Sequence, residues 1–218
     1  MKRFKGLCVL VAMLMLLSVT LSGCGLIDAF TNEDLSLGKI NGTTYVNEYV
    51  GFAIDLSGGW DLSSSDELQR LPDAIEDQMS GSELGSMLDQ YEQIFDLMAE
   101  KDSRVISVNY TKMPLMERVI YAFMSEEMII DTILSQEDML ISTYKSSGIY
   151  PKSIEKVEVE MMGQTHYALH MKATSGGDNY YTLQLFFYQE GSYGVTLTLA
   201  SFDYDHTYEL LELISSVE

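Results

Sequence analysis

Apolar and polar residues alternate along the second half of the chain with the period of two that is typical of β-strands. Four such stretches cover residues 154–161, 165–172, 180–188 and 193–200. They are separated by short turn segments at Met162-Gly163, residues 175–178 and residues 189–192. Consecutive strands joined in this way predict an antiparallel meander. Residues 180–188 are apolar on both sides, so we expect this strand in mid-sheet with cover on both faces.

The first half of the chain mixes strand and helix patterns. Residues 44–50 and 52–56 alternate, and residues 104–111 form a third expected strand. From Ser82 onward, apolar residues recur three and four positions apart, which predicts a helix that starts at Ser82. The apolar positions of this expected helix are Leu84, Met87, Leu88, Tyr91, Ile94, Phe95 and Met98.

Two more helices are expected further along the chain. Ser125 can cap a helix that continues through Tyr144 and stops at Gly148. A last helix is expected from about His206, with Leu210, Leu211 and Ile214 on one stripe. Helices and strands are segregated rather than strictly alternating, which favours a single α+β domain.

The first expected strands carry a spaced aromatic motif. It reads Tyr45-x-Asn47-x-Tyr49-x-Gly51-Phe52-x-Ile54-x-Leu56-x-x-x-Trp60. This motif resembles the start of PsbP-like domains, which include many small lipoproteins of Gram-positive bacteria. One departure is that Ser57-Gly58-Gly59 stands where the family usually has a proline before the tryptophan. The resemblance implies an antiparallel sheet sandwiched by helices, and a binding or assembly role without a shared catalytic set.

The N-terminus has the pattern of an export signal. Lys2, Arg3 and Lys5 precede an apolar run over residues 7–17, which is too short to span a bilayer. The sequence Leu21-Ser22-Gly23-Cys24 then resembles the lipobox of bacterial lipoproteins. That resemblance implies cleavage before Cys24 and a diacylglycerol thioether on its sulfur, with further acylation such as palmitate.

These signals divide the chain into three parts. We expect a signal peptide over residues 1–23, a lipidated tether over 24–42 and a PsbP-like α+β domain over 43–218. The expected location is the extracytoplasmic face of the cell membrane, in a Gram-positive bacterium, with the lipid on Cys24 as the membrane contact.

Composition and charge narrow the function classes. The 218 residues are 46% hydrophobic, which excludes a disordered chain, and two cysteines cannot form a disulfide scaffold. The net charge is −20, which argues against a nucleic-acid partner. Removal of residues 1–23 takes three basic and no acidic residues, leaving ten basic against 33 acidic. A surface this acidic repels anionic lipids and favours cations or basic partners.

Candidate sites for metal or catalysis are sparse. Asp203 and Asp205 could bind a cation, but acids at the start of the last expected helix also fit an N-terminal cap. His166 and His170 lie four apart on an expected strand, too far apart to share a metal ion comfortably. No catalytic residue set and no cofactor is predicted. An envelope hydrolase with unidentified carboxylates remains an alternative, and so does a cation-binding module.

Aromatic and sulfur-containing residues suggest a contact surface instead. Residues 113–128 are unusually apolar for a connector and include Met116 and Phe123. Tyrosines gather in the expected sheet, among them Tyr167, Tyr181 and Tyr188. Tyrosine and methionine both suit adaptable binding surfaces. The sequence therefore predicts a non-catalytic binding or assembly module that contacts an envelope protein or a small ligand through these residues.

Overall fold

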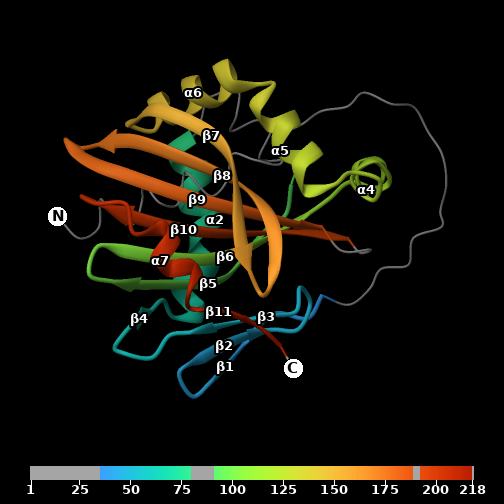
Figure 1. The fold of residues 1–218 in the computed structure, drawn as a ribbon, viewed down its shortest axis with the longest axis vertical. Coiled ribbons are helices and arrows are strands. Elements are labelled where there is room, and N and C mark those ends of the chain that lie inside the picture. Colours follow the sequence, from blue (N-terminus) through green and yellow to red (C-terminus); the bar gives the residue numbers. More distant parts are fainter. Residues whose placement is uncertain (1–34, 80–90, 189–191, 218) are drawn as a thin grey trace.

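The computed structural model describes residues 35–79, 91–188 and 192–217 (Figure 1). Cys24, the expected signal peptide and the beginning of the helix expected from Ser82 lie outside these ranges. The first described strand is β1 (Lys39–Asn41), which pairs with β2. The folded part therefore begins at or before Lys39, a few residues ahead of the boundary expected at residue 43.

A seven-stranded antiparallel sheet forms the centre of the molecule (Figure 1). Its strands lie in the spatial order β4 (Asp61–Leu62), β5 (Gln93–Lys101), β6 (Arg104–Lys112), β10 (Tyr193–Phe202), β9 (Asp178–Tyr188), β8 (Gln164–Ser175) and β7 (Ile149–Met161). The expected meander is confirmed, because β7, β8, β9 and β10 follow one another with antiparallel pairing. The expected mid-sheet position of residues 180–188 is confirmed too, since β9 lies between β10 and β8.

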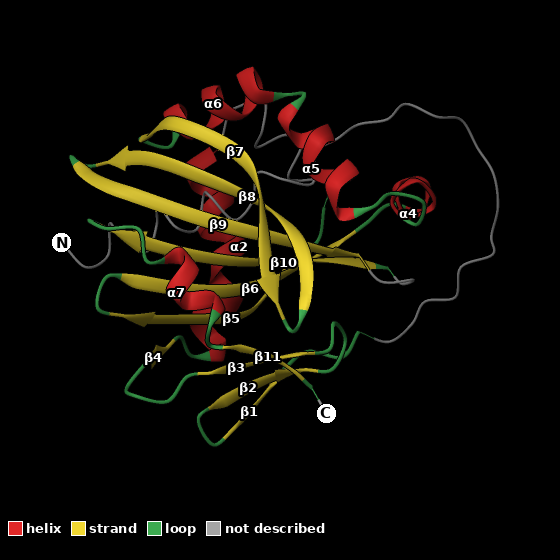
Figure 2. Ribbon diagram, in the orientation of Figure 1, coloured by secondary structure: helices red, strands yellow, loops and turns green. Residues whose placement is uncertain are grey.

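A second, smaller sheet covers one face of the large sheet (Figure 2). Its order is β1, β2 (Thr44–Asn47), β3 (Phe52–Asp55) and β11 (Ile214–Ser216). Apolar side chains of β2 and β3 join those of β6, β9 and β10 in one core between the sheets. The short helix α7 (Thr207–Leu211) adds Leu210 and Leu211 to the same core.

Helices cover the other face of the large sheet. They are α2 (Ser65–Met79), α4 (Leu115–Tyr121), α5 (Glu126–Leu134) and α6 (Glu137–Ser146). Their apolar residues form a second core with the opposite side chains of the large sheet. The expected α+β class, with an antiparallel sheet in a single domain, is thus confirmed. On the opposite face, helix α7 is joined by the small sheet, which the sequence did not predict as a separate layer. None of the helices in the described ranges is long and apolar enough to cross a bilayer.

The helix expected to reach Met98 is wrong at its C-terminal end. Residues Gln93–Lys101 form strand β5, and a β-bulge shifts its register between Phe95 and Leu97. Because the bulge inserts one residue, Phe95 and Met98 both reach the helix-side core although they are three positions apart. The bulge therefore reproduces the spacing of a helix inside a strand.

Helix α2 was not expected from the sequence, although it carries a start signal. The Ser64 hydroxyl accepts a hydrogen bond from the Glu67 backbone N–H, and Glu67 accepts one from the Ser64 backbone N–H at 2.8 Å. This reciprocal pair is a capping box. Leu68, Leu71 and Ile75 then pack against the sheet.

The other helix predictions are partly correct. Ser125 caps α5 as expected, since its hydroxyl accepts a hydrogen bond from the Met128 N–H. The expected single helix up to Tyr144 is divided into α5 and α6 around Ser135 and Gln136. The last helix is shorter than expected, because Ile214 belongs to strand β11 and pairs with Ile54.

A buried hydrogen-bond network fastens the small sheet to the large one. The Asn47 side-chain amide donates to the hydroxyls of Tyr45 at 3.0 Å and Tyr110 at 2.7 Å. The Tyr45 hydroxyl donates in turn to Asp96 at 2.6 Å, and Asp96 also accepts the Gly38 N–H at 2.7 Å. The Tyr-x-Asn part of the aromatic motif therefore has a structural role between the sheets.

Candidate functional site

A cleft of about 360 Å³ lies near helix α4, at one end of the two sheets. Segments distant in sequence form it: the β2–β3 turn, the α4–α5 link with the start of α5, the β7–β8 hairpin, the end of β9 and the end of β11. Its lining residues are Val50, Gly51, Met124, Glu126, Ile129, Met162, Gln164, His166, Phe186, Phe187, Tyr188 and Ser216. This volume lies in the range of sites for small molecules.

Glu126 and His166 form the polar pair of the cleft. Because Ser125 caps α5, Glu126 is the first residue of the helix and faces β8. His166 Nδ1 lies 2.9 Å from one Glu126 carboxylate oxygen and 3.2 Å from the other. The second oxygen also accepts the Tyr167 backbone N–H at 3.2 Å. A carboxylate only accepts hydrogen bonds, so Nδ1 is protonated and donates in this arrangement.

The two groups differ in exposure. The His166 side chain is 11% exposed and the Glu126 side chain is 32% exposed. His166 Nε2 is buried without a hydrogen-bond partner among the described residues. A ligand in the cleft can therefore reach the carboxylate of Glu126 more easily than the imidazole behind it.

The apolar wall of the cleft comes from the last residues of β9. Phe186 and Tyr188 point toward the helices and Phe187 toward the small sheet, so rings line the cleft from both cores. The Tyr188 hydroxyl donates to the Arg118 carbonyl at 3.0 Å, which ties the ring to α4. A much smaller apolar hollow of about 10 Å³ shares Ile129, Phe186, Phe187 and Tyr188 with the cleft, and its other lining residues are Met113, Tyr121 and residues 194–196.

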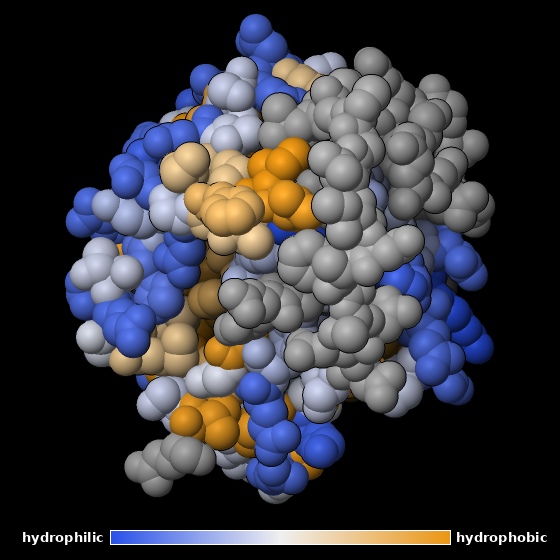
Figure 3. All heavy atoms as spheres, turned by 90° about the vertical axis from the view of Figure 1, so that its right-hand side faces the viewer, coloured by the Kyte–Doolittle hydropathy of each residue, from blue (hydrophilic) through white to orange (hydrophobic). Residues whose placement is uncertain are grey.

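Exposed apolar side chains lie beside the cleft. Phe123 is 84% exposed in the α4–α5 link, and Met128 in the first turn of α5 is 51% exposed. Figure 3 views the end of the molecule that carries these helices and shows apolar atoms gathered among hydrophilic ones. Contact surfaces are built from contiguous exposed apolar residues, and Phe123 and Met128 are two such side chains near the cleft.

The structure separates the tyrosines that were expected to act together. Tyr188 lines the cleft, and Tyr167 is half-buried beside it with its ring near Lys156. Tyr181 lies on the same strand as Tyr188 but seven residues away, which is roughly 23 Å along a strand. Tyr181 also points to the opposite face of the sheet. Phe123 lies near the cleft, whereas the Met116 side chain lies outside the described part of the structure.

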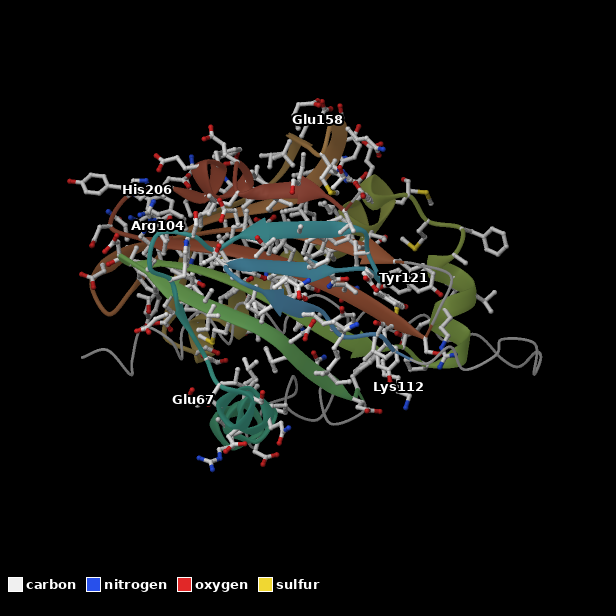
Figure 4. All side chains as sticks on the ribbon, turned by 90° about the horizontal axis from the view of Figure 1, so that it is seen from below. Glu67, Arg104, Lys112, Tyr121, Glu158 and His206 are labelled. Atoms are coloured by element: carbon white, nitrogen blue, oxygen red, sulfur yellow. The ribbon has the colours of Figure 1, made fainter. Side chains whose placement is uncertain are left out.

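Of the two acidic residues near α7, Asp205 is held by protein groups. One Asp205 oxygen accepts hydrogen bonds from the Thr207 N–H at 3.2 Å and the Thr207 hydroxyl at 2.7 Å. His170 Nε2 lies 3.0 Å from the other oxygen. Asp203 is exposed, in a left-handed conformation with φ of 71°. Figure 4 shows His206, from this region, at the end of the sheets opposite Tyr121.

Metal ligation finds little support in the described ranges. His166 and His170 lie on β8 as expected, and each ring contacts a different carboxylate. Within those ranges, no group of three or more His, Cys, Asp or Glu side chains is placed to hold a metal ion.

Two carboxyl groups with raised pKa values lie away from the cleft lining. Burial raises the pKa of Asp96, which bonds to Tyr45 and Gly38 in the network between the sheets. Burial also raises the pKa of Glu117 on α4, which accepts a hydrogen bond from the Tyr91 hydroxyl at 2.6 Å. Glu126 is the single carboxylate among the described residues that line the cleft. A paired-carboxylate hydrolase would need two such groups together.

Sequence reasoning missed most of the cleft. Glu126, Phe186 and Phe187 were not singled out, and His166 was considered only as a metal ligand. The capping serine before Glu126 was the one available signal, since it fixes Glu126 at the start of α5. The aromatic residues look like ordinary core positions of a buried strand.

Comparison with known proteins gives distant likeness to solved structures only. No protein-family model matches the chain, and no curated protein matches it. Among solved structures, the chain is similar to the solution structure of cyanobacterial PsbP (CyanoP) from Synechocystis sp. PCC 6803. The two share 12% sequence identity and a TM-score of 0.44, over 90% of this chain and 98% of that chain. A similarity at this level says nothing about binding or activity.

Proposed function

We propose that this chain is a membrane-anchored extracytoplasmic lipoprotein whose α+β domain is a non-catalytic module for binding a small ligand. The observation that carries the binding role is the cleft of about 360 Å³ with Glu126 and three aromatic residues in its wall. Ligand sites of this size usually combine apolar walls with a few polar groups, as this cleft does.

The chemistry of the cleft supports binding rather than catalysis. Its carboxylate already accepts hydrogen bonds from His166 and from the Tyr167 backbone. The lining residues in the described ranges include no cysteine and no second acid. The described cleft lining therefore lacks the two carboxylates that acid–base hydrolysis of this kind requires.

The anchor and the charge support the location. The lipobox-like sequence Leu21-Ser22-Gly23-Cys24 supplies the lipid attachment, and a net charge of −20 disfavours direct contact with anionic headgroups. The domain would then extend from the membrane on the residues after Cys24, with its cleft accessible to the surroundings.

The test is fragment screening by protein-observed NMR, beside a variant that fills the cleft. Ser216 lines the cleft, whereas Ser215 alternates to the other side of β11. We expect fragments to shift resonances of Glu126 and Tyr188 in the native protein and in Ser215→Trp, and to lose this effect in Ser216→Trp. Fragments that bind elsewhere, or that bind Ser216→Trp equally well, would contradict the proposal.

A second candidate function is contact with an envelope protein through Phe123 and Met128, favoured by their exposure of 84% and 51%. We expect capture of a partner from membranes to fail for a Phe123→Asp, Met128→Asp variant. Tyr204→Asp is the matched control, because Tyr204 is 74% exposed but lies beside the α7 region. Equal capture by both variants would rule out this surface.

A further inference from the structure

We infer that the cleft selects small ligands with a positively charged ammonium group on an apolar body. This inference rests on the proposed ligand-binding function and names the ligand class. It is drawn from the charges, hydrogen-bonding groups and aromatic rings that line the cleft.

The charge of the cleft favours a cation. Among its described lining residues, Glu126 is the single carboxylate, none is lysine or arginine, and His166, 2.9 Å from Glu126, is the one basic side chain. Just outside, Lys156 lies 3.0 Å from Glu127 and 2.7 Å from Asp131, so one lysine faces two acids of α5. An anionic ligand would meet a carboxylate without a lysine or arginine to offset it, in a chain of net charge −20.

The polar groups favour a hydrogen-bond donor. Glu126 accepts from His166 and from the Tyr167 N–H, and two carboxylate oxygens together offer about four acceptor positions. The carboxylate is 32% exposed, so a ligand N–H can use the remaining positions. His166 Nδ1 donates to Glu126, and His166 Nε2 is buried without a partner among the described residues, so the carboxylate is the polar group that a ligand can reach.

The aromatic rings suit an ammonium group with an apolar substituent. Phe186, Phe187 and Tyr188 line the cleft together, and ring faces attract ammonium groups within about 6 Å. Met124 and Met162 add polarisable apolar surface. The cleft itself, with a volume of about 360 Å³, can hold the uncharged end of the ligand against these side chains.

The test uses three probes of similar shape and different charge: 2-phenylethylammonium, 2-phenylethanol and phenylacetate. Binding is measured by NMR titration of the native domain, followed at Glu126 and Tyr188. We expect the ammonium to bind at least about tenfold more tightly than the alcohol, and the carboxylate to bind weakest. Added NaCl should weaken binding of the ammonium but not of the alcohol.

Variants assign the charge effect to one residue. We expect Glu126→Gln to lose the preference for the ammonium, whereas Glu127→Gln keeps it, because Glu127 pairs with Lys156 outside the cleft. If Glu126→Gln does not fold, the effect of NaCl on binding of the ammonium to the native protein shows whether the cleft selects for positive charge.

Three results would overturn the inference. If the alcohol binds the cleft as tightly as the ammonium, or if Glu126→Gln keeps the preference, the cleft still binds ligands but does not select cations. If no probe binds at millimolar concentration although other fragments do, the ligand class is wrong while the proposed function stands. If neither these probes nor any fragment binds the cleft, both fail together.

Discussion

Asn47 makes three hydrogen bonds in the interior between the two sheets. Its amide nitrogen donates to Tyr45 and Tyr110, and its side-chain oxygen accepts the Val50 N–H at 3.0 Å. Asn47→Ala would leave two hydroxyls and one backbone N–H without this partner. We expect a loss of about 2–4 kcal/mol in the free energy of unfolding.

Urea unfolding followed by tyrosine fluorescence measures the effect. Asn41→Ala is the matched control, since Asn41 is exposed on β1, and we expect a change within about 0.5 kcal/mol there. A loss below about 1 kcal/mol in Asn47→Ala would mean that water replaces the network at little cost.

Asp96 makes stability depend on pH. Its pKa is raised by burial, so the folded state binds its proton more tightly than the unfolded state does. The contribution of Asp96 to stability is therefore largest at low pH. It falls as pH rises from the ordinary aspartate pKa through the raised one. We expect Asp96→Asn to remove this fall, because the amide does not ionise and its oxygen can still accept from Tyr45.

The measurement is the free energy of unfolding of native protein and variant from pH 3 to pH 8. As pH rises from the ordinary aspartate pKa through the raised one, the free energy of unfolding of the variant should increase relative to that of the native protein. At higher pH the difference between the two should stay constant. Asp61→Asn on the exposed strand β4 is the control. A constant difference between Asp96→Asn and the native protein at every pH would show that the two states bind this proton equally.

At the residue scale, the sequence could indicate residue types but not their neighbours. Tyr188 was expected at a contact surface, and it does line the cleft. Tyr181 was chosen by the same reasoning and lies on the other face of the same strand. Glu126 was overlooked because its significance depends on His166, forty residues further along the chain.

At the element scale, the cap of α5 holds one side of the cleft. The Ser125 hydroxyl accepts the Met128 N–H at 3.2 Å, and Glu126 follows directly. We expect Ser125→Ala to cost about 1 kcal/mol of unfolding free energy. We also expect it to broaden the NMR signals of Glu126, because the first turn of the helix would fray.

Ser135→Ala at the other end of the same helix is the control. Its hydroxyl donates to the Thr132 carbonyl, so the change removes a hydrogen bond of similar kind without touching the first turn. If both variants broaden the Glu126 signals equally, the cap does not hold the cleft in particular.

Strands with strict alternation were predicted well, because a period of two has few alternative explanations. The meander from β7 to β10 is the example. The bulge in β5 imitated a helical spacing at Phe95 and Met98, and local pattern alone could not distinguish the two. Helix α2 was missed although Ser64 and Glu67 form a capping box; Pro72 inside the helix weakens its pattern.

At the scale of the whole molecule, the cleft exists only because the layers meet at one end. The β2–β3 turn and β11 belong to the small sheet, β8 and β9 to the large sheet, and Met124 and Glu126 to the helical layer. No window of the sequence contains more than part of it. The α+β class was accessible from the order of elements, whereas the cleft depends on how the two cores are stacked.

The proposed attachment of the chain to the membrane gives the last prediction. The lipobox-like sequence predicts a lipid on Cys24, and each buried methylene of an acyl chain would contribute about 0.8 kcal/mol to membrane binding. We expect the native protein, expressed in a Gram-positive host, to incorporate an alkyne analogue of palmitate and to begin at Cys24 by mass spectrometry. Cys24→Ser should incorporate none and should keep residues 1–23, because cleavage in lipoproteins follows lipidation.

Cys8→Ser separates this assignment from a general effect of cysteine loss. Cys8 is the other cysteine of the chain and lies in the apolar run before the lipobox-like sequence. We expect Cys8→Ser to be labelled and cleaved like the native protein. Label retained in Cys24→Ser, or a native chain that is cleaved elsewhere and carries no lipid, would contradict the lipoprotein assignment.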